Sequence, residues 1–162
     1  MKTRKGFVTN SSSSSFILAY NKESFDKDIK SQLQSHYDDE QVKEYMSALK
    51  RFIQKEDSLS IENLEEYLSK SLYYKCKYEI ENDLEYNKGM NYFEIMDFLK
   101  TDEGEKMVQS LMKKEIKKTL LDCKEYDTIK KITIHDDYEP YSSMEYTVVP
   151  SLNECKLKIS HH

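Results

Sequence analysis

The sequence predicts an α+β fold, a single domain in which a small mixed β-sheet is covered by about five α-helices. Three observations lead to this prediction. The 162 residues include only 3 Gly and 2 Pro, so few tight turns are encoded and long helices are favoured. Apolar residues recur at helical spacing over about residues 22–123. They alternate with polar residues over about residues 128–160, as they do in β-strands.

The first predicted element is a strand in the run FILAY, residues 16–20. This run is apolar on both faces, which is typical of a strand in the middle of a sheet. One N-terminal strand, a set of helices and about three C-terminal strands close compactly when all the strands share one sheet. We therefore expect the first strand to join the last three, with the helices on one side of that sheet.

Two helices are predicted to follow this strand. Apolar residues recur every four residues from Phe25, which indicates a helix over about residues 22–36. Asp38, with Gln41 three residues later, forms a capping-box pattern before the apolar stripe of the next helix. The second helix is therefore expected to begin directly after Asp38.

The remaining helices are predicted from their caps and apolar stripes. Ser60 is the expected N-cap of a long third helix whose apolar residues recur in steps of four. Such steps drift around a helix of 3.6 residues per turn, so this helix should curve. Gly89 interrupts the pattern, Asn91 and Glu94 form a second capping box, and a fifth helix is expected over about residues 102–123.

The C-terminal quarter is predicted to hold three strands. In the first, Ile132 and Ile134 lie on one face and the polar residues between them on the other. The segments MEYTVVPS and ECKLKIS also alternate, which predicts a second and a third strand. In the last strand Cys155, Leu157 and Ile159 are expected to face the same way.

Composition and charge exclude several classes of function. The net charge is −5, which argues against direct binding to nucleic-acid phosphates. No stretch reaches the roughly 18 apolar residues that span a bilayer, so we expect no membrane partner and a cytoplasmic location. Cys76, Cys123 and Cys155 are odd in number and form no C-x-x-C pair, so neither a disulfide framework nor a cysteine zinc site is expected. Cys76 and Cys123 lie on apolar helix faces, which predicts buried thiols, and no cofactor is predicted.

The N-terminal segment RKGFVTNSSSSSFIL, about residues 4–18, carries the most unusual pattern in the chain. It resembles a motif, R-x-G-F-V-[ST]-N-S-S-S-S-S-F, found at the start of many small and largely uncharacterised proteins of bacteria and their phages. The resemblance covers about a tenth of the chain. It implies a bacterial or phage origin and a real role for the residues of the motif, but it carries over no catalytic residue. The candidate binding residues are Arg4, Asn10, Ser11, Ser12, Ser13, Ser14 and Ser15.

Three physical explanations of the serine run remain open. The hydroxyls could satisfy polar groups in an irregular turn, with the flanking Phe residues in the core. Exposed hydroxyls and amides could bind an anion beside Arg4, although the glycines of a phosphate loop are absent. The segment could also be a handle that another protein reads or processes.

A possible metal site is the main enzymatic candidate. If the strands that end near His135 and His161 pair, imidazoles and carboxylates would meet at one end of the sheet, a ligand set that suits zinc or another divalent cation. Acidic residues after a strand also commonly just begin a loop, and a terminal His pair is commonly frayed. The candidate ligands are His135, Asp136, Asp137, His161 and His162.

Acidic, tyrosine-rich segments form the last candidate site. Carboxylates and phenols on a rigid helical frame can present phosphate-like charge to a basic groove of a partner. The partner-facing acidic residues are expected to be Asp38, Asp39, Glu79, Glu81, Asp83 and Glu85. The leading hypothesis is a non-enzymatic interaction protein of bacterial or phage origin, an acidic inhibitor of a host nucleic-acid-binding defence protein with a basic surface. The alternative is a metal-dependent hydrolase or nuclease that uses the histidine and aspartate cluster.

Overall fold

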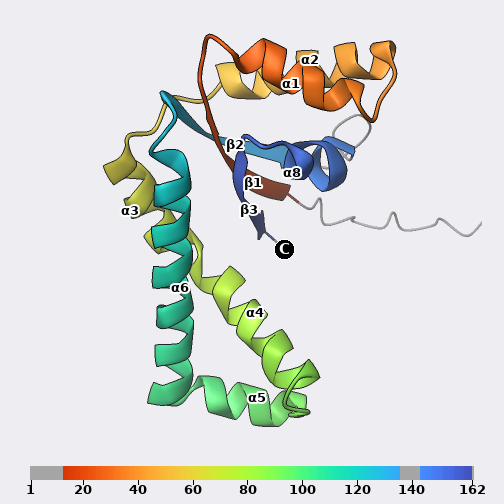
Figure 1. The fold of residues 1–162 in the computed structure, drawn as a ribbon. Helices are drawn as coiled ribbons and strands as arrows, with labels where there is room; N and C mark the ends of the chain where they lie inside the picture. Colours follow the sequence, from red (N-terminus) through yellow and green to blue (C-terminus); the bar gives the residue numbers. More distant parts are fainter. Residues whose placement is uncertain (1–12, 136–142, 162) are drawn as a thin grey trace, which may run out of the picture.

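A three-stranded antiparallel sheet lies at the centre of the computed structural model, which describes residues 13–135 and 143–161 (Figure 1). The strands are β1 (Ser13–Tyr20), β2 (Thr128–His135) and β3 (Cys155–His161), in the order β2-β1-β3. The side chains of β1 from Phe16 to Ala19 are fully buried. The prediction that FILAY forms a central strand is therefore confirmed.

Helices make up most of the remaining described chain, and the predicted α+β class is confirmed. The prediction of a mixed sheet was wrong, because β1 pairs antiparallel with both β2 and β3. No helix within the described ranges is long and apolar enough to cross a membrane. The helices are α1 (Phe25–Gln34), α2 (Asp39–Gln54), α3 (Ile61–Ser71), α4 (Tyr73–Tyr86), α5 (Tyr92–Leu99), α6 (Asp102–Cys123), the π-helix η1 (Met144–Val148) and α8 (Val149–Ser151).

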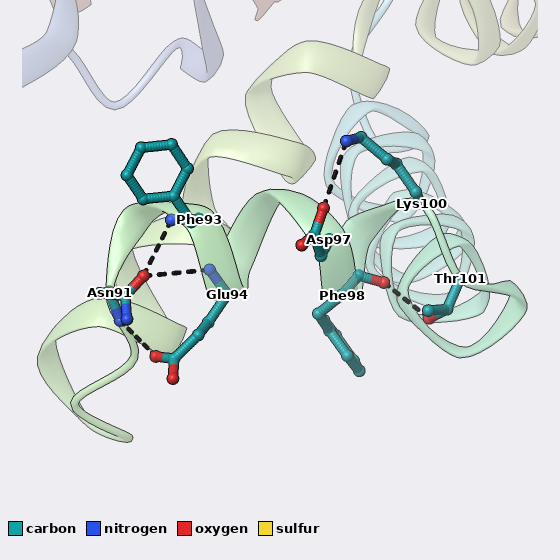
Figure 2. A network of polar contacts seen from close by, with 7 residues as sticks. All are labelled: Asn91, Phe93, Glu94, Asp97, Phe98, Lys100 and Thr101. Carbon is teal, nitrogen blue, oxygen red and sulfur yellow. Dashed lines mark hydrogen bonds and ion pairs between the residues drawn. The ribbon is translucent and has the colours of Figure 1, made fainter.

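The predicted caps of α2, α3 and α5 are present. Asp38 accepts a hydrogen bond from the backbone N–H of Gln41, whose side chain returns one to Asp38, and Ser60 caps α3. Figure 2 shows the second capping box, in which Asn91 accepts from the backbone N–H of Glu94 and the Glu94 carboxylate accepts from that of Asn91. These caps satisfy N–H groups that have no partner inside the helix, which fixes where α2, α3 and α5 begin.

Helices cover both faces of the sheet, so the prediction of helices on one side was wrong. Phe16 and Leu18 point into a core shared with α1, α2, η1 and α8. Ile17 and Ala19 point into a second core shared with α3, α4, α5 and α6. A strand that is apolar on both faces needs an apolar layer on each, and the sequence pattern contained this information.

The predicted strand MEYTVVPS is helical, forming η1 and α8, which corrects the predicted number of C-terminal strands from three to two. Met144, Val148 and Val149 are buried in the first core, at a spacing that suits one face of a helix. Pro150 lies in the first turn of α8, where its missing N–H costs no hydrogen bond. The same Pro would remove a ladder hydrogen bond from a strand.

Two further details differ from the sequence predictions. The expected long third helix is divided at Leu72, which ends α3 and begins α4, although its buried stripe continues across the break. A register shift in β3 pairs Ile17 with Leu157 but Leu18 with Cys155. Cys155 therefore packs against the first core, and not with Leu157 in the second.

Candidate functional site

The described part of the serine run is built into the sheet. Ser13, Ser14 and Ser15 begin β1, whereas Arg4, Asn10, Ser11 and Ser12 lie outside the described residues. Ser14 is fully buried and its hydroxyl donates a hydrogen bond of 2.6 Å to Oε1 of Glu145. The hydroxyls of Ser15 and Thr133 share a hydrogen bond of 3.0 Å across β1 and β2. For these serines the contacts favour the structural explanation, in which hydroxyls satisfy polar groups.

Glu145, the partner of Ser14, is a buried residue that sequence reasoning did not single out. Its side chain is completely inaccessible to solvent, and its second oxygen, Oε2, has no hydrogen-bond partner within the described chain. Lys158 Nζ donates to the backbone carbonyl of Glu145 at 3.2 Å and lies 4.9 Å from the ring centre of Tyr146. The only available signal was a lone carboxylate within an apolar segment, and pairing it with Ser14 required the tertiary fold.

The structure places two histidines of the predicted metal site, His135 and His161, at the same end of the sheet. His135 and His161 both register against Ser13, from opposite sides of β1. β2 and β3 do not pair directly, so their backbones are about 10 Å apart. Asp136, Asp137 and His162 lie outside the described residues. Within the part that is described, no three His, Cys, Asp or Glu side chains gather as a metal-binding group.

The six acidic residues expected to face a partner lie in two separate places. Asp38 caps α2 and Asp39 lies in its first turn, on the layer formed by α1 and α2. The others, Glu79, Glu81, Asp83 and Glu85, belong to α4 on the opposite side of the sheet. Figure 1 shows these two layers well apart. The structure does not bring the six together as one surface.

On α4 the acidic residues lie along two flanks. Tyr74, Tyr78, Glu81 and Glu85 have the spacing i, i+4, i+7 and i+11, so they form one stripe along the helix. Glu79 and Asp83 lie four residues apart on the other flank, next to α6. One flank of α4 therefore carries the exposed Tyr74 and Tyr78, and the other lies beside α6.

Exposed aromatic side chains gather on α4 and at the start of α5. The structure describes seven large apolar residues that are strongly exposed, and five of them lie there. Tyr74 is 79% exposed and Phe93 is 77% exposed. We call these five residues the aromatic surface: Tyr74, Tyr78, Tyr86, Tyr92 and Phe93. Tyr74 and Tyr78 adjoin along one flank of α4, Tyr86 lies on the flank of Glu79 and Asp83, and the rings of Tyr92 and Phe93 lie 5.8 Å apart. Exposed apolar side chains that adjoin one another are typical of interaction sites.

The charges beside the aromatic surface are partly paired along the helix. Lys75 forms an ion pair with Glu79, and Lys77 Nζ lies 3.9 Å from Oε1 of Glu81. Glu85 has no ion pair with any described side chain. Surface i, i+4 pairs contribute only about 0.3–0.5 kcal/mol, and these two are partly exposed, so a partner can displace them at small cost.

The thiols do not supply a nucleophile. Burial raises the pKa of Cys76, Cys123 and Cys155 to about 11, so they are protonated at neutral pH. The predicted burial of Cys76 and Cys123 is confirmed.

Comparisons with known protein families, curated proteins and solved structures give no match.

Proposed function

We propose that this chain is a non-enzymatic protein–protein interaction protein of bacterial or phage origin. In this proposal it is an acidic inhibitor that binds a basic, nucleic-acid-binding host defence protein through the aromatic surface of α4 and α5. The observation that supports it is the concentration of exposed aromatic side chains on these two helices, beside the exposed Glu85 and the partly exposed Glu81.

The side-chain chemistry of the surface suits protein recognition. Tyr and Phe each bury a large apolar area when a partner covers them, and Tyr keeps a hydroxyl at the rim for a hydrogen bond. Glu81 and Glu85 lie in the same stripe as Tyr74 and Tyr78. Carboxylates beside aromatic rings match an arginine of the partner, because its guanidinium can stack on a ring and pair with a carboxylate at once.

The proposed inhibition follows from the charge of the chain. A nucleic-acid-binding protein presents a basic groove to phosphates, and a chain with net charge −5 is attracted to the same groove. Occupying that groove excludes the nucleic acid by competition. The rate of association should fall as salt is raised, because exposed charges are screened.

The test is affinity capture from nuclease-treated bacterial lysate, followed by retention of the captured protein on heparin. The double variant Tyr74→Ser/Tyr78→Ser should lose the captured protein. The matched control Tyr146→Ser removes an exposed tyrosine from η1, away from α4, and should retain it. Addition of the chain should then release DNA from the purified partner.

Two outcomes would count against the proposal. Equal capture by wild type and the double variant would show that Tyr74 and Tyr78 do not contribute to binding. Loss of function in a His135→Ala variant that still captures the partner would instead favour the metal-dependent enzyme. His135 is exposed at the end of β2, so this substitution leaves both cores intact.

A further inference from the structure

A row of lysines lies along the exposed side of α6. Its members have the spacing i, i+7, i+11 and i+18, which places them within about 20° of one line on a helix of 3.6 residues per turn. We call these four exposed residues the lysine stripe: Lys106, Lys113, Lys117 and the C-cap Lys124. The stripe extends over about 27 Å at 1.5 Å per residue. Figure 1 shows α6 at one side of the molecule, so a large partner can approach it.

The positive charge of the lysine stripe is not neutralised by nearby carboxylates. The ion pairs of the described chain do not involve any of its four lysines. Between Lys106 and Lys124 the sequence of α6 has two acidic residues, Glu115 and Asp122. Both lie about 160–180° around the helix from the stripe, and Glu115 is 3.9 Å from Lys75 of α4. The stripe is therefore a line of positive charge without an acidic residue in it.

The helix dipole does not account for this line. It favours cations at the end of a helix, and the effect falls off within the last turn. Lys106, Lys113 and Lys117 lie more than one turn before the end of α6 at Cys123. Solubility does not account for it either, because charge of either sign serves that purpose, and α2 and α4 mix lysine with acidic residues.

We propose that the lysine stripe binds the sugar-phosphate backbone of a nucleic-acid duplex without reading its sequence. Lysines that neutralise phosphates release condensed counterions, which favours binding. A duplex rises about 3.4 Å per base pair, so the stripe matches the length of about eight base pairs and all four lysines can contact one duplex. Lysine meets a phosphate as a point charge, so the contact carries no base-specific geometry.

The chemistry of this side of α6 favours a duplex over other anionic partners. α6 has no aromatic residue on which the bases of a single strand could stack. Leu121 is 63% exposed, and it is the one large apolar side chain described on α6 that is strongly exposed. A single Leu supplies too little apolar surface to insert into an anionic membrane or to anchor a protein interface.

The net charge of −5 does not prevent this contact. At 0.1 M salt, exposed charges more than about 10 Å apart are largely screened from one another, so the charges next to the duplex decide whether it binds. The acidic residues of α1 and α2 belong to the layer on the opposite face of the sheet from α6. The stripe shares no residue with the aromatic surface, so this inference is independent of the proposed inhibitor function.

The test is the fluorescence anisotropy of a labelled DNA duplex of about 20 base pairs, titrated with the full chain. The logarithm of the association constant should change by about −0.9 per phosphate contact and per unit of log salt, so four contacts predict a loss of about 150-fold between 50 and 200 mM NaCl. The variant that combines Lys106→Gln, Lys113→Gln, Lys117→Gln and Lys124→Gln should bind at least about tenfold more weakly at 50 mM NaCl, with a shallower salt dependence. It should still capture the host protein through the aromatic surface.

A matched control separates the stripe from the net charge. Replacing four exposed lysines of the α1–α2 layer changes the net charge by the same amount and should leave binding close to that of wild type: Lys27→Gln, Lys30→Gln, Lys43→Gln and Lys55→Gln. Arginine in place of all four stripe lysines should keep binding, because a guanidinium also pairs with phosphate. Circular dichroism checks that each variant is folded.

Three results would overturn the proposal. The first is no binding of the duplex by wild type at 50 mM NaCl. The second is an equal loss of binding in the stripe variant and in the matched control, since the net charge alone would then explain it. The third is tighter binding to phosphatidylserine vesicles than to the duplex, which would make a membrane the partner of this surface.

Discussion

Replacing Ser14 by Ala tests the role of the serine run most sharply. The substitution removes the donor to Oε1 of Glu145, whose Oε2 has no other partner in the described chain, so a fully buried carboxylate loses its side-chain hydrogen bond. A hydrogen bond contributes about 0.5–1.5 kcal/mol, and leaving a buried polar group without its partner costs about 1–3 kcal/mol. We expect a loss of about 2–3 kcal/mol in the free energy of unfolding.

The assay is urea unfolding followed by circular dichroism. With an m-value of about 2 kcal/mol/M, the midpoint should fall by about 1–1.5 M. Ser15→Ala is the matched control, because it removes a neutral hydrogen bond to Thr133 and should cost only about 0.5–1.5 kcal/mol. In a Glu145→Met background, which has no acceptor for the Ser14 hydroxyl at this position, Ser14→Ala should cost less than about 1 kcal/mol. Equal costs of Ser14→Ala in the two backgrounds would refute the reasoning.

Three further predictions concern stability and thiol chemistry. Gly104→Ala should lower the melting temperature, because the new Cβ would lie 2.3 Å from the Phe98 carbonyl oxygen, although Ala in a helix interior normally stabilises by about 0.5–1 kcal/mol. Asn91→Ala should lower the free energy of unfolding in urea by about 1 kcal/mol, because α5 loses its N-cap (Figure 2). Cys76 and Cys123 should react with a thiol reagent at pH 8 only after unfolding, because burial raises their pKa to about 11. The stability they contribute is present below their unfolded pKa of about 9 and is lost as the pH rises through 11.

Each of these predictions has a clear contrary result. A higher melting temperature for Gly104→Ala would mean that α5 and α6 do not approach as closely as the structure shows. An unchanged urea midpoint for Asn91→Ala would mean that the capping box does not stabilise α5. Rapid labelling of Cys76 in the native protein would show that the second core opens readily, and stability that is constant from pH 9 to 11 would show the same.

Local signals in the sequence predicted β1 and the caps of α2 and α5 correctly. FILAY is apolar on both faces because β1 has a core on each side. Asp38 and Asn91 are followed three residues later by Gln41 and Glu94, and both capping boxes form. These features depend on neighbours within one turn of the chain, so a pattern of a few residues is enough to predict them.

Where the sequence pattern fits two alternative structures, tertiary contacts determine which one forms. The segment at Met144 fits a strand by alternation and a helix by the spacing of Met144 and Val148, and burial of Glu145 against Ser14 belongs to the helical form. The sequence also showed that α4 is acidic and rich in tyrosine. Helical spacing alone places Glu81 and Glu85 on the flank of Tyr78, but only the packing of α4 against α6 shows that Asp83 lies beside α6.

The central claim is that the aromatic surface binds a partner, and site-specific photocrosslinking in host cells tests it most directly. A photoreactive phenylalanine analogue in place of Tyr78 should yield one dominant crosslinked species with a basic host protein, whereas the same analogue in place of Tyr146 should not. Both positions are exposed, at 64% and 50%, so accessibility alone does not separate them. Equal crosslinking at the two positions, or none at Tyr78, would contradict the account.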